Sequence, residues 1–181
     1  CATNLADNPL QTLQYAKRAH QVGMQLQNKS DVFEALVIAG NALIMLNEPT
    51  RALLPLFGAR ALAIELKDNQ KITRILMPLA NAWGLLNHIP LASAAMIGAL
   101  LFEDEEVIGN LPSTESAAFE EYRAAANRIR QAGEAEKFML DLEKAISSIA
   151  DKFSFEFLDT PEGVAGGSRT SNSSLSTQKK L

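Results

Sequence analysis

Three asparagines are the residues of this sequence whose types and positions best suit hydrogen bonding to a partner. Asn41 and Asn81 are 40 positions apart, and Asn127 follows 46 positions later. A side-chain amide both donates and accepts hydrogen bonds, so amides that recur at one helical position can form a ladder of such bonds. The alternative is that each amide bonds only a neighbouring helix or water, as most half-buried amides do. The sequence leaves both interpretations open.

Residues suited to catalysis or metal binding are scarce. His20 and His88 have no Cys, His, Asp or Glu at the spacing of metal ligands. Cys1 is the only cysteine, which excludes an intramolecular disulfide, and no paired histidine supports it as a nucleophile. The run from Glu103 to Glu106 lacks the alternating ligands and central glycine of a calcium loop, so a solvated connection is expected. Phosphate-binding, dinucleotide-binding, serine-hydrolase and zinc-protease motifs are absent from the sequence. We therefore expect no enzyme activity, no metal and no cofactor.

The composition indicates a helix-rich globular chain with one core. Its 181 residues are 47% hydrophobic and only 6% aromatic. The formal net charge of -4 argues against binding to DNA, RNA or an anionic membrane surface. The longest apolar stretches, 76–86 and 90–102, are shorter than the roughly 18 to 20 residues of a membrane span. These properties favour a protein or peptide partner and no direct membrane insertion.

The first residue allows two interpretations. Because the chain does not begin with Met, the sequence starts inside a longer protein, or Cys1 is the first residue of a processed product such as a lipid-anchored bacterial lipoprotein. A single cysteine fits a reducing compartment, so a cytoplasmic location is expected. A processed Cys1 would instead imply the periplasm or the cell surface.

A repeat of 40 residues runs through the first hundred positions. The same step relates Ala19, Ala59 and Ala99, and it also relates several other pairs: Leu26 and Leu66, Asn41 and Asn81, Leu46 and Leu86, and Ala52 and Ala92. Each repeat has the pattern of two helices, and such a pair cannot bury its apolar face without stacking on the next pair. The recurrent small residues allow neighbouring helix axes to approach closely.

Capping residues and prolines predict where the helices begin. Ser30 and Asp31 are expected to be N-cap residues of one helix, and Pro49 is expected to open the next. The first helix of the following repeat is expected to begin near Lys71 and to bend at Pro78.

Beyond Leu101 the step between repeats changes from 40 to 46 residues, and Gly133 takes the position of a hairpin turn. The predicted hairpins are about 30–68, 70–102 and 115–153, after a partial repeat at 8–28. The third hairpin is the most charged, so we expect it to cap a repeat domain that covers residues 1–158. The Ser/Thr/Gly-rich tail, 159–181, is expected to be disordered.

With these motifs the sequence resembles the tetratricopeptide-repeat family in its long variant. The family pattern is met twice: by Leu79-Ala80, Trp83, Ala92, Met96 and Ala99, and by Ala39-Gly40, Leu43, Ala52, Leu56 and Ala59. The resemblance implies an all-α fold in which antiparallel helix hairpins stack into a right-handed superhelix with a concave groove. Trp83, at the aromatic position of the pattern, is expected in the core.

The resemblance also implies a binding site. In that family the helix position of Asn41, Asn81 and Asn127 faces the concave groove and binds peptide. Its expected neighbours are chiefly apolar: Glu34, Val37, Ile44, Met45, Arg74, Met77, Gly84 and Leu85. Such a surface suits an amphipathic helix or a hydrophobic peptide. Family members that bind a C-terminal carboxylate have lysines where this chain has Val37 and Met77, which argues against recognition of chaperone tails.

Three hypotheses for the function follow. The leading one is a non-enzymatic scaffold or adaptor that binds a peptide or partner helix in the groove. The second is the C-terminal helical sensor of a larger signalling ATPase or transcriptional regulator, because Ala94–Ala99, Leu111–Ser113 and Phe119–Tyr122 are similar to the end of that region. The third is a lipid-anchored bacterial adaptor.

Overall fold

The computed structural model describes residues 8–102 and 117–151. Within these ranges the chain forms seven α-helices and no strand, as expected for an all-α repeat fold. The helices are α1 (Pro9–Gln25), α2 (Lys29–Met45), α3 (Pro49–Glu65), α4 (Asn69–Leu85), α5 (Ile89–Phe102), α7 (Ala117–Gln131) and α8 (Ala135–Ala150). Cys1, the acidic run Glu103–Glu106, residues 115–116 and 152–153 of the third predicted hairpin and the predicted tail lie outside the described residues.

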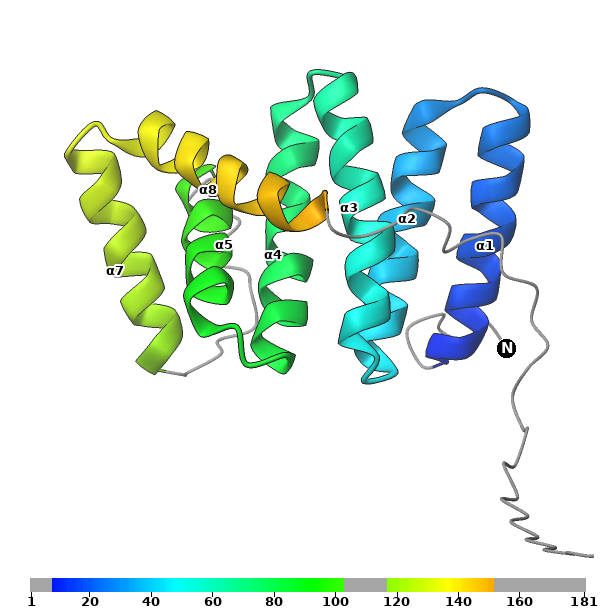
Figure 1. Cartoon of the computed structure of the whole chain (residues 1–181), viewed down its shortest axis with the longest axis horizontal. Coiled ribbons are helices and arrows are strands. Elements are labelled where there is room, and N and C mark those ends of the chain that lie inside the picture. The colour runs from blue at the N-terminus through cyan, green and yellow to red at the C-terminus, as the bar shows by residue number, and fades with distance from the viewer. Residues whose placement is uncertain (1–7, 103–116, 152–181) are drawn as a thin grey trace, which may run out of the picture.

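Helices α1 to α5 form a repeat array in which each helix packs beside the next in chain order (Figure 1). Their first residues fall at positions 9, 29, 49, 69 and 89, a constant step of 20 residues. The 40-residue sequence repeat therefore consists of two structural units of equal length. Since consecutive units are antiparallel, residues 40 positions apart lie on helices that run in the same direction.

The turns of the array all have one geometry. At the first turn the Asn28 backbone N–H donates to the Gly23 carbonyl at 2.9 Å and the Gln27 N–H donates to the Met24 carbonyl at 3.2 Å. This pair of bonds defines the Schellman motif, which requires a left-handed residue after the helix. That residue is Gln27, with a φ of 53°, and its equivalents at the next three turns are Asn47, Lys67 and Asn87, with φ of 55° to 59°.

The helix starts agree with the sequence expectation in part. Pro49 opens α3, as predicted. The N-cap of α2, however, is Asn28 and not Ser30 or Asp31, because its side-chain oxygen accepts from both of those backbone N–H groups, at 3.1 and 3.3 Å. The helix predicted to begin near Lys71 begins at Asn69 and continues through Pro78. For α2 the sequence placed the start too late because a serine or aspartate in the first turn resembles a cap.

Small residues and large side chains together fill the core of the array. A Cβ atom added to Gly40 would lie 2.5 Å from Cδ2 of Leu56, which confirms that α2 and α3 approach closely there. Trp83 is 1% exposed and its ring centroid lies 6.4 Å from that of Phe57, so the predicted core position of Trp83 is confirmed. None of the described helices is long and apolar enough to cross a membrane.

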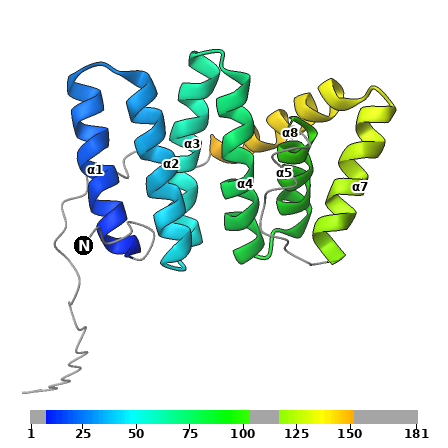
Figure 2. The ribbon, with the colours of Figure 1, turned by 180° about the vertical axis from the view of Figure 1, so that it is seen from behind.

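Helix α8 departs from the stacked arrangement. Instead of lying beside α7, it crosses the array on the side of α3 and α5 (Figures 1 and 2). Arg60 of α3 donates through Nη2 to Glu143 Oε2 and, at 2.9 Å, to Ser147 Oγ. On α5, Gly98 has no side chain where Leu142 approaches, since an added Cβ would lie 2.8 Å from Leu142 Cδ2. The last two described helices thus do not stack as a further array hairpin.

Candidate functional site

The candidate site lies on α2 and α4, the helices predicted to line a groove. They run in the same direction and contact each other directly. Arg74 of α4 donates from Nη1 and Nη2 to the two carboxylate oxygens of Glu34 on α2, at 2.8 and 2.9 Å. These residues are one repeat apart, so the ion pair shows that the 40-residue step places equivalent positions on adjacent helices.

This ion pair determines the electrostatics of one end of the surface. The pKa of the Glu34 carboxyl is lowered, chiefly because Arg74 donates side-chain hydrogen bonds to it, and the pKa of Arg74 is raised by the same bonds. Arg74 and Lys71 also lie over the Phe33 ring, 5.7 and 5.4 Å from its centroid. Glu34 and Arg74 are therefore both charged at neutral pH. A charged group of a partner must either bind alongside this ion pair or replace one of its two members.

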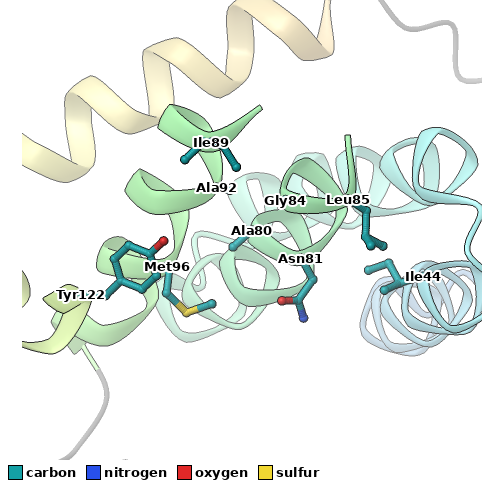
Figure 3. A pocket seen from close by; sticks show the side chains of 9 residues that line it. All are labelled: Ile44, Ala80, Asn81, Gly84, Leu85, Ile89, Ala92, Met96 and Tyr122. Atoms are coloured by element: carbon teal, nitrogen blue, oxygen red, sulfur yellow. The ribbon is translucent and has the colours of Figure 1, made fainter. Parts of the chain in front are cut away.

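Toward the C-terminal end of α4 is an open groove of about 420 Å³ (Figure 3). Its floor is α4, with Ile44 of α2 on one side and residues of α5 and α7 on the other. The lining residues are Ile44, Ala80, Asn81, Gly84, Leu85, Ile89, Ala92, Met96 and Tyr122. Asn81 and Tyr122 contribute the polar side chains. The groove therefore suits an apolar ligand that also carries a hydrogen-bonding group.

The groove contains part of the predicted set. It unites Ile44, Asn81, Gly84 and Leu85 from two repeats. Space at Gly84 is open, because a Cβ added there would have no atom within 4 Å. This glycine is thus the position in the groove where a side chain can be introduced without a clash.

Other predicted residues lie elsewhere. Asn41 and Met45 are exposed on α2 outside the lining, and Met77 is half-buried against the main core. Val37 is only 6% exposed and belongs to that core. It therefore has little surface to offer a peptide, because it packs inward between helices where the sequence placed it in the groove.

Asn127 does not continue the series of Asn41 and Asn81. It lies on α7, where its Oδ1 accepts from Arg130 Nη1 at 2.7 Å. Arg130 also donates from Nε to the Leu101 carbonyl at 3.0 Å, so this part of α7 holds the last turn of α5. Asn127 therefore bonds a side chain of its own helix, and that side chain, Arg130, makes the contact with α5.

The direction of α7 explains this difference. Ser93 and Tyr122 make a hydroxyl–hydroxyl bond of 3.3 Å, and further along both helices Arg130 bonds the carbonyls of Leu100 and Leu101. The residue numbers rise together, so α5 and α7 are parallel, and α7 is antiparallel to α4. The expected equivalence of Asn127 with Asn81 at a step of 46 residues is not what the structure shows.

Sequence reasoning missed five lining residues: Ala80, Ile89, Ala92, Met96 and Tyr122. Ala80, Ala92 and Met96 are positions of the repeat pattern and were expected only as packing residues. A signal was available, because the repeat register ends after α5 and these positions of α4 and α5 are the last ones in that register. No comparable signal identifies Tyr122, whose position depends on how α7 packs.

The rest of the described chain offers no metal site, since no group of three or more potential His, Cys, Asp or Glu ligands occurs there. His88 lies in the turn between α4 and α5 and is exposed. Comparison with protein-family models, curated proteins and solved structures finds no match.

Proposed function

We propose that the chain is a non-enzymatic protein-interaction module of the tetratricopeptide type, with its hairpins stacked in a right-handed superhelix. It binds a peptide or a partner helix on the surface of α2 and α4, as a scaffold or adaptor in a larger assembly. The regular pairs of helices and the parallel course of α2 and α4 support this proposal. The net charge of -4 favours a protein over nucleic acid as the partner.

The observation that carries the proposal is the open groove on α4. Ile44, Leu85 and Met96 offer apolar surface there, and Leu85 is 50% exposed. Burying one large apolar side chain of a partner would contribute roughly 1.5–3 kcal/mol. The Asn81 amide can pair with a backbone group of the same partner, which fixes its orientation.

A substitution at Gly84 tests the proposal. Gly84→Glu fills the groove with a charged side chain, whereas Gly84→Ala adds one methyl group to open space. We expect partners co-purified with the tagged full chain from its native cells to be lost with Gly84→Glu and retained with Gly84→Ala. Gln21→Glu, on the exposed side of α1, serves as the charge control.

Thermal unfolding of each variant separates loss of binding from loss of folding. Gly84 lies within a helix and a Cβ added there meets no atom within 4 Å, so replacing this glycine favours the helix and neither Gly84 variant should unfold earlier. An unchanged set of partners with folded Gly84→Glu would show that the groove is not the binding site.

A further inference from the structure

Helix α8 rests on a surface formed by α3 and α5. On α5, a Cβ added to Gly98 would lie 2.8 Å from Cδ2 of Leu142. On α3, the guanidinium of Arg60 donates to Glu143 and Ser147. We call the part of α3 and α5 that contacts α8, which includes Arg60 and Gly98, the α8-binding surface. Neither of these two residues lines the groove on α4.

The repeat shows what this surface is like without α8. Gly58 of α3 is the 40-residue equivalent of Gly98. An added Cβ would lie 3.4 Å from Cδ1 of Leu36 at Gly58, and 3.1 Å from Cδ1 of the equivalent Leu76 at Gly98. Side chains of α8 also lie within 4 Å at Gly98, whereas at Gly58 no further described residue does. The same helix–helix contact thus forms with and without a helix over it, so α8 is an addition to the array and not one of its repeated parts.

The array and α8 contribute different kinds of side chain to this contact. Leu142 and Ile146 of α8 are large, apolar and at most 4% exposed. The core cluster that contains them also contains Ala95 and Ala99 of α5, and the array adds the charged side chain of Arg60. Small side chains expose little apolar area when a helix leaves, and water solvates a charge. The array side of the contact therefore tolerates uncovering better than a surface of large apolar side chains would.

Helix α8 pairs incompletely with Arg60. Nη2 of Arg60 makes the bonds to α8, which go to Oε2 and the carbonyl of Glu143 and to Oγ of Ser147. Nε of Arg60 and Oε1 of Glu143 are buried and have no hydrogen-bond partner among the described residues, although the Arg60 side chain is only 9% exposed. By contrast, two nitrogens of Arg74 bond both carboxylate oxygens of Glu34. Buried polar atoms without partners oppose the attachment of α8, so a helix with a better-placed carboxylate would bind more tightly.

We propose that the α8-binding surface binds a helix of a partner protein and that α8 is the chain's own competitor for that surface. The partner helix carries apolar side chains at the spacing of Leu142, Ile146 and Ala150, which α8 buries in the main core. It also carries a carboxylate that pairs with both Nε and Nη2 of Arg60, which α8 of a second copy would not supply. Helix α8 is displaced when the partner binds. This inference goes beyond the proposed function and does not depend on the groove on α4.

A fluorescent peptide of residues 135–150 tests whether the surface accepts a helix from outside the chain. In the full chain, Ile146→Ala removes a buried contact of α8 and leaves α3 and α5 unchanged. We expect the peptide to bind this variant at least tenfold more tightly than wild type, because its competitor is weakened. Leu140→Ala, at an exposed position of α8, should bind the peptide as wild type does. Equal affinity for all three chains, or binding to none, would overturn the proposal.

Two further variants separate release of α8 from loss of folding and from binding in the groove. Glu143→Ala in the full chain weakens α8 through a different contact and should raise peptide affinity as Ile146→Ala does, with helical circular dichroism retained. Unfolding of both variants would show that α8 cannot leave the array, which would overturn the inference. Adding Gly84→Glu should leave the peptide affinity of either variant unchanged, because Gly84 lies in the groove. Loss of peptide binding with Gly84→Glu would overturn this inference and leave the proposed function intact.

A displayed library of 16-residue helices tests the carboxylate of the partner. The library keeps the apolar residues at the positions of Leu142, Ile146 and Ala150 and varies the other positions of α8. Helices selected on the wild-type chain should carry Asp or Glu close to the position of Glu143 and bind at least tenfold more tightly than the α8 peptide. Their binding should speed amide hydrogen exchange in α8 and not in α1, and Arg60→Leu should remove the acidic preference. If no library member bound more tightly than the α8 peptide, or if tighter members had no acidic preference, the inference would be wrong.

Discussion

The repeat array and the two C-terminal helices use the same turn but differ in how their helices pack. Between α7 and α8, the Glu134 N–H donates to the Ile129 carbonyl and Gly133 adopts a φ of 70°, which reproduces the turns between α1 and α5. Yet α5 and α4 lie side by side, whereas α8 leaves α7 and crosses the array (Figure 2). The turn therefore determines how the backbone leaves one helix and enters the next. Side-chain packing determines which helices the next helix lies against.

The contacts of α8 show why its position differs. One face of α8 places Leu142, Ile146 and Ala150 in the main core. On α3 the nearly buried Arg60 bonds Glu143 and Ser147. Removing one partner of such a pair leaves the other charge nearly buried and uncompensated, which is costly, so the pair ties the position of α8 to that of α3. Helix α8 is thus held by α3 and α5 at once.

Among the substitutions that test this comparison, truncation of Trp83 in the array should reduce the free energy of unfolding the most. Trp83→Ala removes a fully buried ring from the array, and we expect the free energy of unfolding to fall by about 3–5 kcal/mol. Denaturant titration with far-ultraviolet circular dichroism measures the change. Phe102→Ala, which truncates an exposed aromatic residue, is the control. A loss below about 1 kcal/mol would mean that Trp83 is not part of a shared core.

Truncation of Ile146 tests whether α8 can be loosened separately. Ile146→Ala should cost about 2–4 kcal/mol, because the side chain is fully buried against the array. We expect amide hydrogen exchange to accelerate first in α8 and to stay slow in α1 and α2. Leu140→Ala, at an exposed position of α8, should leave exchange unchanged. Uniform acceleration along the chain would show that α8 and the array unfold as one unit.

Substitutions at two equivalent turns should have smaller effects of opposite sign. Lys67 has a φ of 55° without being glycine, so Lys67→Gly should stabilise the chain by about 0.5–1 kcal/mol. Gly133→Ala places a side chain at a φ of 70° and should destabilise it by about 1 kcal/mol. Thermal melts of both variants measure the shifts. Equal signs would contradict a shared turn geometry.

The smallest predicted effect is the pH dependence contributed by Glu34. Its folded pKa lies below the ordinary value of 4.5, so its contribution to stability is present above pH 4.5 and is lost as pH falls through the folded pKa. Both side chains of the pair are substantially exposed, so we expect less than about 1 kcal/mol, and less in high salt. The difference between wild type and Glu34→Gln, measured from pH 6 to pH 3, isolates this part. A difference that grows as pH falls would contradict the assigned direction.

Local features of the fold were accessible from the sequence, and long-range packing was not. The 40-residue period, the helix opened by Pro49 and the buried Trp83 follow from spacing, capping and size. The parallel course of α7 and the crossing of α8 depend on contacts such as Arg60 with Glu143, 83 positions apart. Periodicity along one segment carries no information about such contacts.

The same division applies to the candidate site. The repeat step brought Ile44, Asn81 and Leu85 together correctly, because equivalent positions lie on neighbouring parallel helices. It failed for Asn127, whose helix runs in the opposite direction to α4, and for Val37, which points into the core. Spacing predicts which residues share a side of the array. How deeply each side chain is buried depends on the side chains that pack around it.

The constant 20-residue unit has a consequence for how such a chain can change in length. Because every unit reverses the direction of the backbone, duplicating or deleting one unit would send all later helices the opposite way and exchange their inner and outer faces. Duplicating two units would restore both direction and face. Tolerated insertions and deletions should therefore comprise an even number of units. The helix pair, and not the single helix, is then the smallest segment by which such a chain can grow or shrink.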